Sequence, residues 1–247
     1  MNQLQREEHF NALMRMAILE PYYAWIYDKF KAYIGHRILD AGCGVGNFSA
    51  LVEHRATKIW AADMVSENLM QAHSRFSRSD NIEVVQVDFE KDDRFFTAKN
   101  IDTIVCLDVL EHIQDDLRLL DLFYQNILPK GHLLIKVPAC KKLFGSIDVA
   151  SGHYRRYEPY ELAFKCKKVG WKIKEFGYMN FVGVLPYWFK SKTLKKNENF
   201  SRTFSYWQLM VIKKLIRIIK KIDRLTGPPV GLSALVVAYK EGGDCKF

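Results

Sequence analysis

The sequence predicts an α/β fold in which a doubly wound, seven-stranded and mostly parallel sheet carries a helical insertion before its last strand. Three observations lead to this fold class. Short apolar runs alternate with amphipathic stretches along most of the chain, which is typical of parallel strands joined by helices. A glycine-rich turn follows the first strand, and doubly wound sheets bind ligands at such turns. The 247 residues, 49% of them apolar, suffice for a sizeable core.

The order of these patterns gives the predicted elements. Apolar runs predict strands at residues 37–41, 58–62, 82–87, 101–107, 132–137, 171–179 and 232–239. Helical spacing predicts helices at about 46–54, 66–77, 115–127, 158–169 and 207–225. Residues 7–30 are predicted to form a helical region that Pro21 divides into two pieces. We expect one of the last two strands to run antiparallel.

Pattern and charge divide the chain into four segments. Residues 1–36 are expected to form a helical lid, 37–180 the ligand-binding core, 181–227 a basic helical insertion, and 228–247 the last strand and tail. The stretch 181–225 holds eleven basic and two acidic side chains, which accounts for the whole net charge of +9. The rest of the chain is therefore neutral and needs no polyanionic partner.

The predicted helix at 207–225 has two distinct faces. Its lysines and arginines share one side, and its isoleucines, leucines and valine share the other. Three interpretations stay open: a helix packed on the body with a solvated basic face, a lid, or a helix lying on an anionic membrane and giving access to a lipid-linked ligand. No known RNA-binding module accompanies this helix, so nucleic acid is not the expected partner.

The sequence predicts neither export nor a membrane span. The longest uncharged stretch of interest, residues 181–189, is too short and contains Gly183 and Pro186. Charged residues stand where a signal peptide needs an apolar run, so we expect a cytoplasmic protein, at the inner face of the membrane if the membrane interpretation holds. The five cysteines lack CxxC spacing, and no cluster in the sequence predicts a metal site.

The glycine-rich turn is the strongest local signal. Residues 38–46 read ILDAGCGVG, in which Gly42, Gly44 and Gly46 allow a tight turn and a close approach of the backbone to a ligand. A dinucleotide fingerprint would place its third glycine at Asn47, and no Lys-Ser/Thr pair forms a phosphate loop. Asp40 would repel a phosphate and attract an ammonium group. This favours a zwitterionic or cationic ligand.

Acidic residues also end the next two predicted strands. Asp63 stands 23 residues after Asp40, where a carboxylate can accept hydrogen bonds from both hydroxyls of a ribose. Asp88 can accept from the exocyclic amine of a purine, while Met64 and Phe89 supply apolar faces for the ring. Each aspartate alone is more often a turn residue at a strand end. Three of them beside a glycine loop favour a binding site.

These motifs, together with IDTIVCLDVLEHI at residues 101–113, resemble a class I S-adenosylmethionine-dependent methyltransferase. The resemblance covers about residues 15–180 and the final strand, and it implies the Rossmann-like fold of that family with its last strand antiparallel. It also implies S-adenosylmethionine as the cofactor, with its methionine part in the glycine loop, its ribose at Asp63 and its adenine at Asp88 and Phe89. The expected cofactor residues are Asp40, Gly42, Cys43, Gly44, Gly46, Asp63, Met64, Asp88, Phe89, Leu107 and Asp108.

A narrower resemblance concerns four further segments. Residues 22–26 (YYAWI), the pair GSID at 145–148 and GHYRRY at 152–157, and PPVGLS at 228–233 are similar to a bacterial subgroup often found near or fused to glycosyltransferases. The substrates of that subgroup are largely unassigned. This resemblance therefore leaves the methyl acceptor open.

Two histidines are candidates for acid–base catalysis. Methyl transfer requires an aligned nucleophile and, for oxygen and many nitrogen acceptors, removal of a proton. His112 follows the fourth predicted strand, and His153 lies in the loop after the fifth, where loops build substrate pockets. The alternative for His112 is a helix-start residue bonded to backbone, and for His153 a solvated loop position.

Arginine and aromatic side chains are candidates for binding the acceptor. Arg155 and Arg156 would suit a carboxylate or phosphate on the acceptor, or they pair with Asp148 or Glu158 instead. The aromatic candidates form a lid over the cofactor or belong to the core, and they are Tyr22, Tyr23, Tyr154 and Tyr157. A weaker candidate, Arg15, could approach the methionine carboxylate.

The sequence thus predicts a methyltransferase that acts on a small-molecule or lipid-linked acceptor bearing an anionic group. Two rival interpretations stay open. One is an RNA or protein methyltransferase, and the other is a non-catalytic S-adenosylmethionine-binding partner protein. Poised histidines and arginines favour the enzyme, since a pure binder needs no base.

Overall fold

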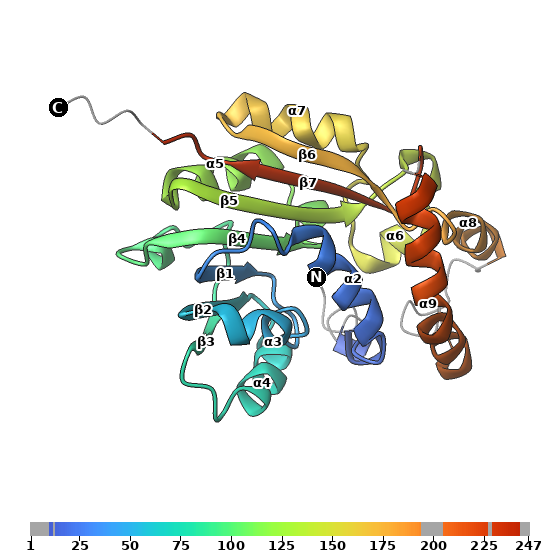
Figure 1. Ribbon diagram of the computed structural model, residues 1–247, viewed down its shortest axis with the longest axis horizontal. Coiled ribbons are helices and arrows are strands. Elements are labelled where there is room, and N and C mark those ends of the chain that lie inside the picture. Colours follow the sequence, from blue (N-terminus) through green and yellow to red (C-terminus); the bar gives the residue numbers. More distant parts are fainter. Residues whose placement is uncertain (1–9, 12, 194–204, 227–228, 243–247) are drawn as a thin grey trace.

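A seven-stranded sheet forms the centre of the protein in the computed structural model, which describes residues 10–11, 13–193, 205–226 and 229–242 (Figure 1). Its strands follow the order β3-β2-β1-β4-β5-β7-β6. Their bounds are β1 Arg37–Ala41, β2 Lys58–Asp63, β3 Ile82–Gln86, β4 Ile101–Leu107, β5 Ile127–Pro138, β6 Lys172–Met179 and β7 Ser233–Tyr239. β7 runs antiparallel to β5 and β6, while β1 to β5 are parallel. The predicted doubly wound sheet with one antiparallel strand is confirmed.

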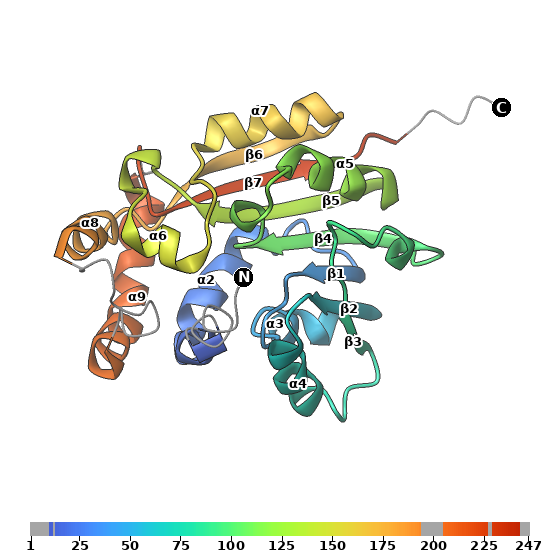
Figure 2. The same ribbon diagram turned by 180° about the vertical axis from the view of Figure 1, so that it is seen from behind.

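Helices cover both faces of the sheet because its central strands are apolar on both sides (Figures 1 and 2). Leu39 belongs to the core on the face covered by α5 (Asp116–Asn126) and α7 (Pro159–Val169). Ile38, its neighbour, points to the opposite core, which α2 (Glu20–Phe30) and α4 (Ser66–Arg75) help to form. The chain winds in opposite directions from β1 and β4. A crevice opens at the carboxyl ends of these strands.

Several predicted elements differ in extent. The helix predicted at 46–54 is shorter, since residues 42–48 form turns before α3 (Ser49–Val52) and a 3-10 turn at Glu53–Arg55. Strand β5 begins five residues earlier than predicted, and it pairs with β4 across a register shift. Pro21 lies at the start of α2, where its missing N–H costs nothing. The first part of the predicted region 7–30 is helical at 10–11 and 13–16, and residues 1–9 and 12 lie outside the described residues.

The insertion between β6 and β7 contains two described helices, α8 (Val184–Thr193) and α9 (Tyr206–Thr226). The sequence predicted α9 within one residue at each end, whereas α8 and the short α6 (Ser146–Ser151) were not predicted. Helix α9 packs against α2 with buried side chains that include Leu209 and Ile216. Within the described ranges, no helix is both long and apolar enough to cross a membrane.

Asp223 fixes the far end of α9 to the sheet. Its carboxylate is 1% exposed and accepts hydrogen bonds from the backbone N–H groups of Asn180 (2.6 Å) and Phe181 (2.9 Å), which follow β6. No other described side chain bonds to these two donors. The helix is therefore anchored by a buried polar contact as well as by its apolar face.

Replacing Asp223 by Ala should lower the free energy of unfolding by about 1 to 3 kcal/mol, because two partly buried backbone donors lose their acceptor. Urea denaturation followed by circular dichroism measures this loss. Asp80→Ala, at an exposed position, is the matched control and should change stability little. Equal stability of the two variants would contradict the anchoring role of Asp223.

Candidate active site

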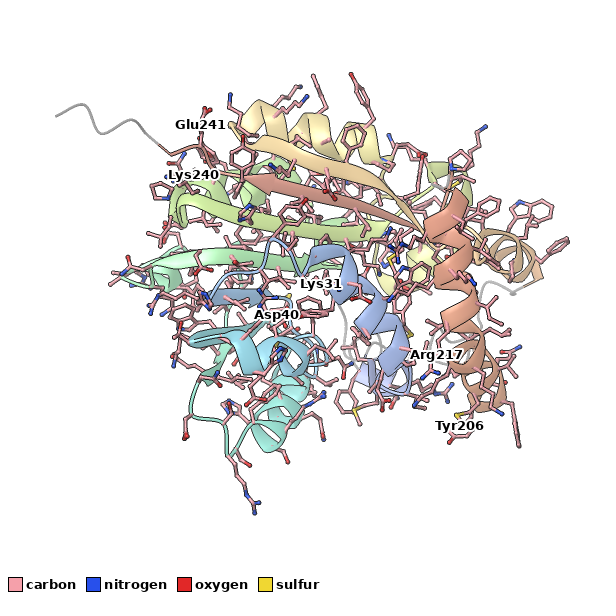
Figure 3. The ribbon with its side chains drawn as sticks, in the orientation of Figure 1. Lys31, Asp40, Tyr206, Arg217, Lys240 and Glu241 are labelled. Atoms are coloured by element: carbon pink, nitrogen blue, oxygen red, sulfur yellow. The ribbon has the colours of Figure 1, made fainter. Side chains whose placement is uncertain are left out.

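A cavity of about 530 Å³ lies at the carboxyl ends of β1 to β4, within the range of small-molecule sites. Four consecutive strand ends contribute to it because parallel strands end at the same edge of the sheet. Ten of the expected cofactor residues line it: Asp40, Gly42, Cys43, Gly44, Asp63, Met64, Asp88, Phe89, Leu107 and Asp108. Figure 3 shows Asp40 on β1 near the middle of the molecule.

Two glycines shape the wall of the cavity next to β1. Gly42 and Gly44 have φ values of 75° and 55°, which favour glycine. A Cβ on Gly42 would lie 2.2 Å from Val109, so the turn also packs tightly against the loop after β4. Gly46 does not line the cavity, unlike the other ten expected cofactor residues. Its Cα faces Phe76 of the α4 C-terminus, which a Cβ would approach to 2.3 Å.

Asp63 holds the glycine turn in place. One carboxylate oxygen accepts the N–H of Gly44 at 2.8 Å, and the other accepts the N–H of Val65 at 2.8 Å and the amide of Asn68 at 3.2 Å. A carboxylate offers about four acceptor positions, so capacity for a further donor remains. Asp63 therefore shapes the cavity and still presents an oxygen to a ligand.

Asp40 is a buried carboxylate with a neutral partner. It is 2% exposed, and the hydroxyl of Ser49 donates to it at 2.6 Å. Burial raises its pKa to about 6, and the hydrogen bond from Ser49 only partly offsets this effect. No ion pair to Asp40 is found among the residues that the structure describes. A cationic ligand group beside it would therefore gain a strong partner.

Aromatic packing builds the wall at the end of β3. Phe89 lines the cavity and contacts three phenylalanine rings, with centroids 5.7 to 5.9 Å away, at Phe95, Phe96 and Phe123. This cluster fixes the ring of Phe89. Asp88, next to Phe89 in the sequence, also lines the cavity, and its carboxylate accepts a hydrogen bond from the ammonium group of Lys91 at 2.7 Å. The wall thus combines an apolar ring with a carboxylate.

An ion pair at the end of β4 was not predicted. Lys136 of β5 is buried, and its ammonium group donates to Asp108 at 2.5 Å. Burial alone would lower the pKa of Lys136, but the charge of Asp108 outweighs this and raises it. The pair holds Asp108 at a φ of 55°, in the left-handed region. The signal in the sequence was a lysine within the apolar run of residues 133–137.

His112 and His153 meet on the far side of the cavity, with ring centroids 4.7 Å apart. Nδ1 of His153 lies 2.9 Å from Asp148, a fully buried carboxylate. Burial alone would raise the pKa of Asp148, but hydrogen bonds from His153 and Arg156 hold it below its ordinary value. Asp148 is therefore ionised and accepts the proton on Nδ1. In a neutral imidazole, this hydrogen bond leaves Nε2 of His153 as the proton acceptor.

Glu111 lies beside the two histidines. Neither of its carboxylate oxygens has a hydrogen-bond partner on another described residue, and burial raises its pKa well above the ordinary value. Possible metal-ligand atoms of Glu111, His112 and His153 lie within 4.8 Å of one another, a grouping that sequence spacing had not indicated.

The comparison with known proteins decides the family. The profile of a family described as a methyltransferase domain matches residues 17–176, which is more than half of the chain. The chain belongs to this methyltransferase family. The expected enzyme class is thereby confirmed, and the cavity lies within the matched residues except for Leu13.

Individual relatives of this methyltransferase are distant. The ubiquinone biosynthesis O-methyltransferase of Acinetobacter baylyi is 21% identical over 172 residues, covering 64% of this chain and 72% of that protein. A SAM dependent methyltransferase from Archaeoglobus fulgidus has a TM-score of 0.57 at 20% identity, covering 87% and 91% of the two chains. Phosphoethanolamine N-methyltransferase 2 of Haemonchus contortus, solved with S-adenosyl-L-methionine, has a TM-score of 0.60 at 19% identity, covering 92% and 57%. The solved structures confirm the fold.

Four of the expected acceptor residues do not line the cavity of this methyltransferase. Arg155 pairs with Asp116 at 3.0 Å, and Arg156 pairs with Asp148 at 2.8 Å in a buried position. Tyr157 is fully buried and donates to Asp116 at 2.8 Å. Tyr22, the fourth residue, packs edge-on against Tyr23 and Trp25. Contacts within the protein therefore occupy all four side chains.

The other two expected acceptor residues do line the cavity. Tyr23 and Tyr154 lie on its wall, and burial raises the pKa of Tyr23 to about 12. The sequence did not indicate Val149 and Gly152, which line the cavity from α6 and the position after it. They belong to the loop that carries His153. A short helix ending in glycine, before GHYRRY, was the signal that could have identified them.

Replacing Asp40 by Asn should stabilise the methyltransferase above pH 6. In the folded state Asp40 stays protonated up to about pH 6, whereas an unfolded aspartate ionises near pH 4, so the wild type loses stability as pH rises between these values. The Asp40→Asn variant avoids the loss of up to about 3 kcal/mol in the free energy of unfolding that ionisation of the buried carboxylate causes. This advantage of the variant vanishes below pH 4. Urea denaturation between pH 4 and pH 7.5 measures it. A difference that does not change with pH would contradict the burial effect, and Asp80→Asn is the exposed control.

Proposed function

We propose that this methyltransferase transfers a methyl group from S-adenosylmethionine to a small-molecule or lipid-linked acceptor. One observation carries the proposal. Three carboxylates, Asp40, Asp63 and Asp88, end successive strands and line one cavity together with two left-handed glycines. A dinucleotide or a nucleoside triphosphate would bring phosphates towards these carboxylates. A cationic nucleoside fits them instead.

Different residues that line the cavity suit different parts of the cofactor. Asp40 suits the ammonium group of the methionine part, because a cation stabilises its ionised form. Asp63 suits the ribose hydroxyls, which can donate to its remaining acceptor positions. Phe89 and Asp88 suit the adenine ring and its amine. When bound, the cofactor supplies an electrophilic methyl group on a sulfonium.

His153 is proposed as the general base. The hydrogen bond from Nδ1 to Asp148 orients its ring and would stabilise the imidazolium that forms when Nε2 takes a proton. His112 packs edge-on against this ring and lines the same cavity, so it is proposed to orient the acceptor. A base is needed for a hydroxyl acceptor, and oxygen methylation is therefore the reaction that this pair suits best.

The acceptor side of the cavity is largely apolar. Val149, Tyr154 and Ile113 line it near the two histidines. The arginines that had suggested an anionic group are held in ion pairs with Asp116 and Asp148, which removes the reason to expect one. An apolar acceptor with a reactive hydroxyl agrees with this wall. The distant similarity to ubiquinone biosynthesis O-methyltransferases supports the same class.

The test is transfer of radiolabelled methyl groups from S-adenosylmethionine into lipid and polar fractions of a cell extract. His153→Ala should lower the rate constant about 100- to 10,000-fold and leave cofactor affinity within about twofold, since the base acts only in transfer. Calorimetric titration measures the affinity.

His73→Ala is the matched control, because His73 is exposed on α4 away from the cavity. It should retain the wild-type rate. If His153→Ala transfers the label at the wild-type rate, His153 is not the general base. A wild-type protein that neither binds the cofactor nor labels either fraction would disprove the proposed function.

A further inference from the structure

Helix α9 exposes a second apolar face in addition to the one that it buries. Leu209, Ile216 and Asp223 are buried against α2 and the end of β6. On a helix with about 100° per residue, these residues share an arc of roughly 40°. A separate arc of roughly 80° carries large exposed apolar side chains, here called the apolar strip: Trp207, Val211, Leu215, Ile218, Ile222 and Leu225.

The exposure of the apolar strip is unusual for a folded protein. Trp207 and Leu225, near the two ends of the helix, are 79% and 77% exposed, and Ile218 between them is 57% exposed. Single exposed apolar residues are common, but a continuous row along five turns marks an interaction surface. The strip extends over about 27 Å at 1.5 Å per residue.

A row of cations borders the apolar strip. Lys214, Arg217, Lys221 and Arg224 are exposed and occupy an arc of roughly 80° beside it. They form no ion pair within the described part of the chain. By contrast, Lys213 and Lys220 turn towards α2 and pair with Glu20 and Asp28. Internal pairing therefore accounts for two basic residues of α9, and four remain on its outer surface, among them Arg217, which Figure 3 labels.

Helix α8 extends this surface. Leu185 and Phe189 are 66% and 61% exposed, and Phe181 just before the helix is also exposed. Both α8 and α9 lie at the end of the sheet where β4 and β5 end, which is the end that carries the cavity (Figures 1 and 2).

We propose that the outer surface of α9 and α8 docks on an anionic lipid bilayer, with α9 lying in the plane of the interface. Apolar side chains would enter the boundary between headgroups and acyl chains, while the adjacent lysines and arginines contact anionic headgroups. A tryptophan at the end of the strip suits the interface, where amphipathic rings concentrate. This inference does not depend on the proposed methyl transfer.

Charge selects the bilayer over other occupants. A second copy of the chain would bring two rows of cations close together around the apolar strips, which opposes pairing. An RNA would neutralise the cations but leave the apolar strip in water. Of these three occupants, an anionic lipid surface is the one that satisfies the apolar strip and the row of cations at once.

The test is flotation of the full-length protein with vesicles of phosphatidylcholine alone or of equal parts phosphatidylcholine and phosphatidylglycerol. We expect binding to the anionic vesicles that weakens at high salt. Lys214→Gln with Lys221→Gln should weaken binding about ten- to thirtyfold, and Leu215→Ser with Ile218→Ser at least tenfold. Circular dichroism and the thermal unfolding midpoint verify that each variant is folded.

Matched controls come from α7, on the other face of the sheet. Lys167→Gln with Lys168→Gln, and Tyr160→Ser with Phe164→Ser, change equally exposed side chains and should bind as the wild type does. Trp207→Phe should still bind the anionic vesicles. Docking of the wild type should shift its tryptophan emission to the blue, and this variant should lose most of that shift while keeping the other four tryptophans.

Several results would overturn the proposal. They are equal binding to neutral and anionic vesicles, wild-type binding by either α9 double variant, and no vesicle binding at all. A dimer in light scattering that Leu215→Ser with Ile218→Ser dissociates, without vesicle binding, would assign the strip to a second copy. Salt-sensitive binding of tRNA without vesicle binding would assign the basic row to RNA.

Discussion

The site depends on the burial of carboxylates at the ends of neighbouring parallel strands. Asp63 bonds to the backbone of Gly44 and Val65 and so fixes the turn after β1. Asp40 lies behind this turn, its carboxylate accepts the hydroxyl of Ser49, and burial raises its pKa to about 6. A buried carboxylate without a cation is costly, and a cationic ligand relieves that cost. The same constraint shapes the cavity and selects its ligand.

Sequence patterns predicted the sheet well because both faces of the central strands are apolar. Continuous apolar runs such as residues 234–238 stand out against charged helices, and the strand bounds agree within about one residue except for β5. The expected cofactor residues lie at or soon after the ends of these strands, and ten of the eleven line the cavity. Gly46 is the exception among them, because its glycine serves packing against Phe76.

Pairing across long stretches of sequence limited the prediction of the acceptor side. Arg155 pairs with Asp116, 39 residues away, and no local pattern connects them. Similarly, no local sequence pattern indicates that Lys136 pairs with Asp108, which lies 28 residues earlier in the chain. In GHYRRY, His153 lines the cavity while its neighbouring arginines hold the loop in place. The motif thus contains a histidine that lines the cavity and two arginines that form ion pairs within the structure.

A chain of contacts connects the proposed membrane surface to the proposed base. Tyr187 of α8 lies 3.5 Å from Asp148 and also bonds to Arg156, and Asp148 in turn orients His153. The helix that would lie on the lipid surface therefore shares a carboxylate with the histidine beside the acceptor wall.

The most direct test of the central claim is the pH dependence of S-adenosylmethionine affinity, measured by calorimetry for the wild type and for Asp40→Asn. Between pH 5 and pH 7 the wild-type dissociation constant should fall about tenfold, because the ammonium group favours ionised Asp40 and its pKa is about 6. The variant should bind more weakly, with an affinity that does not change over this range. Equal, pH-independent affinities of the two proteins, or no binding by the wild type, would contradict the account.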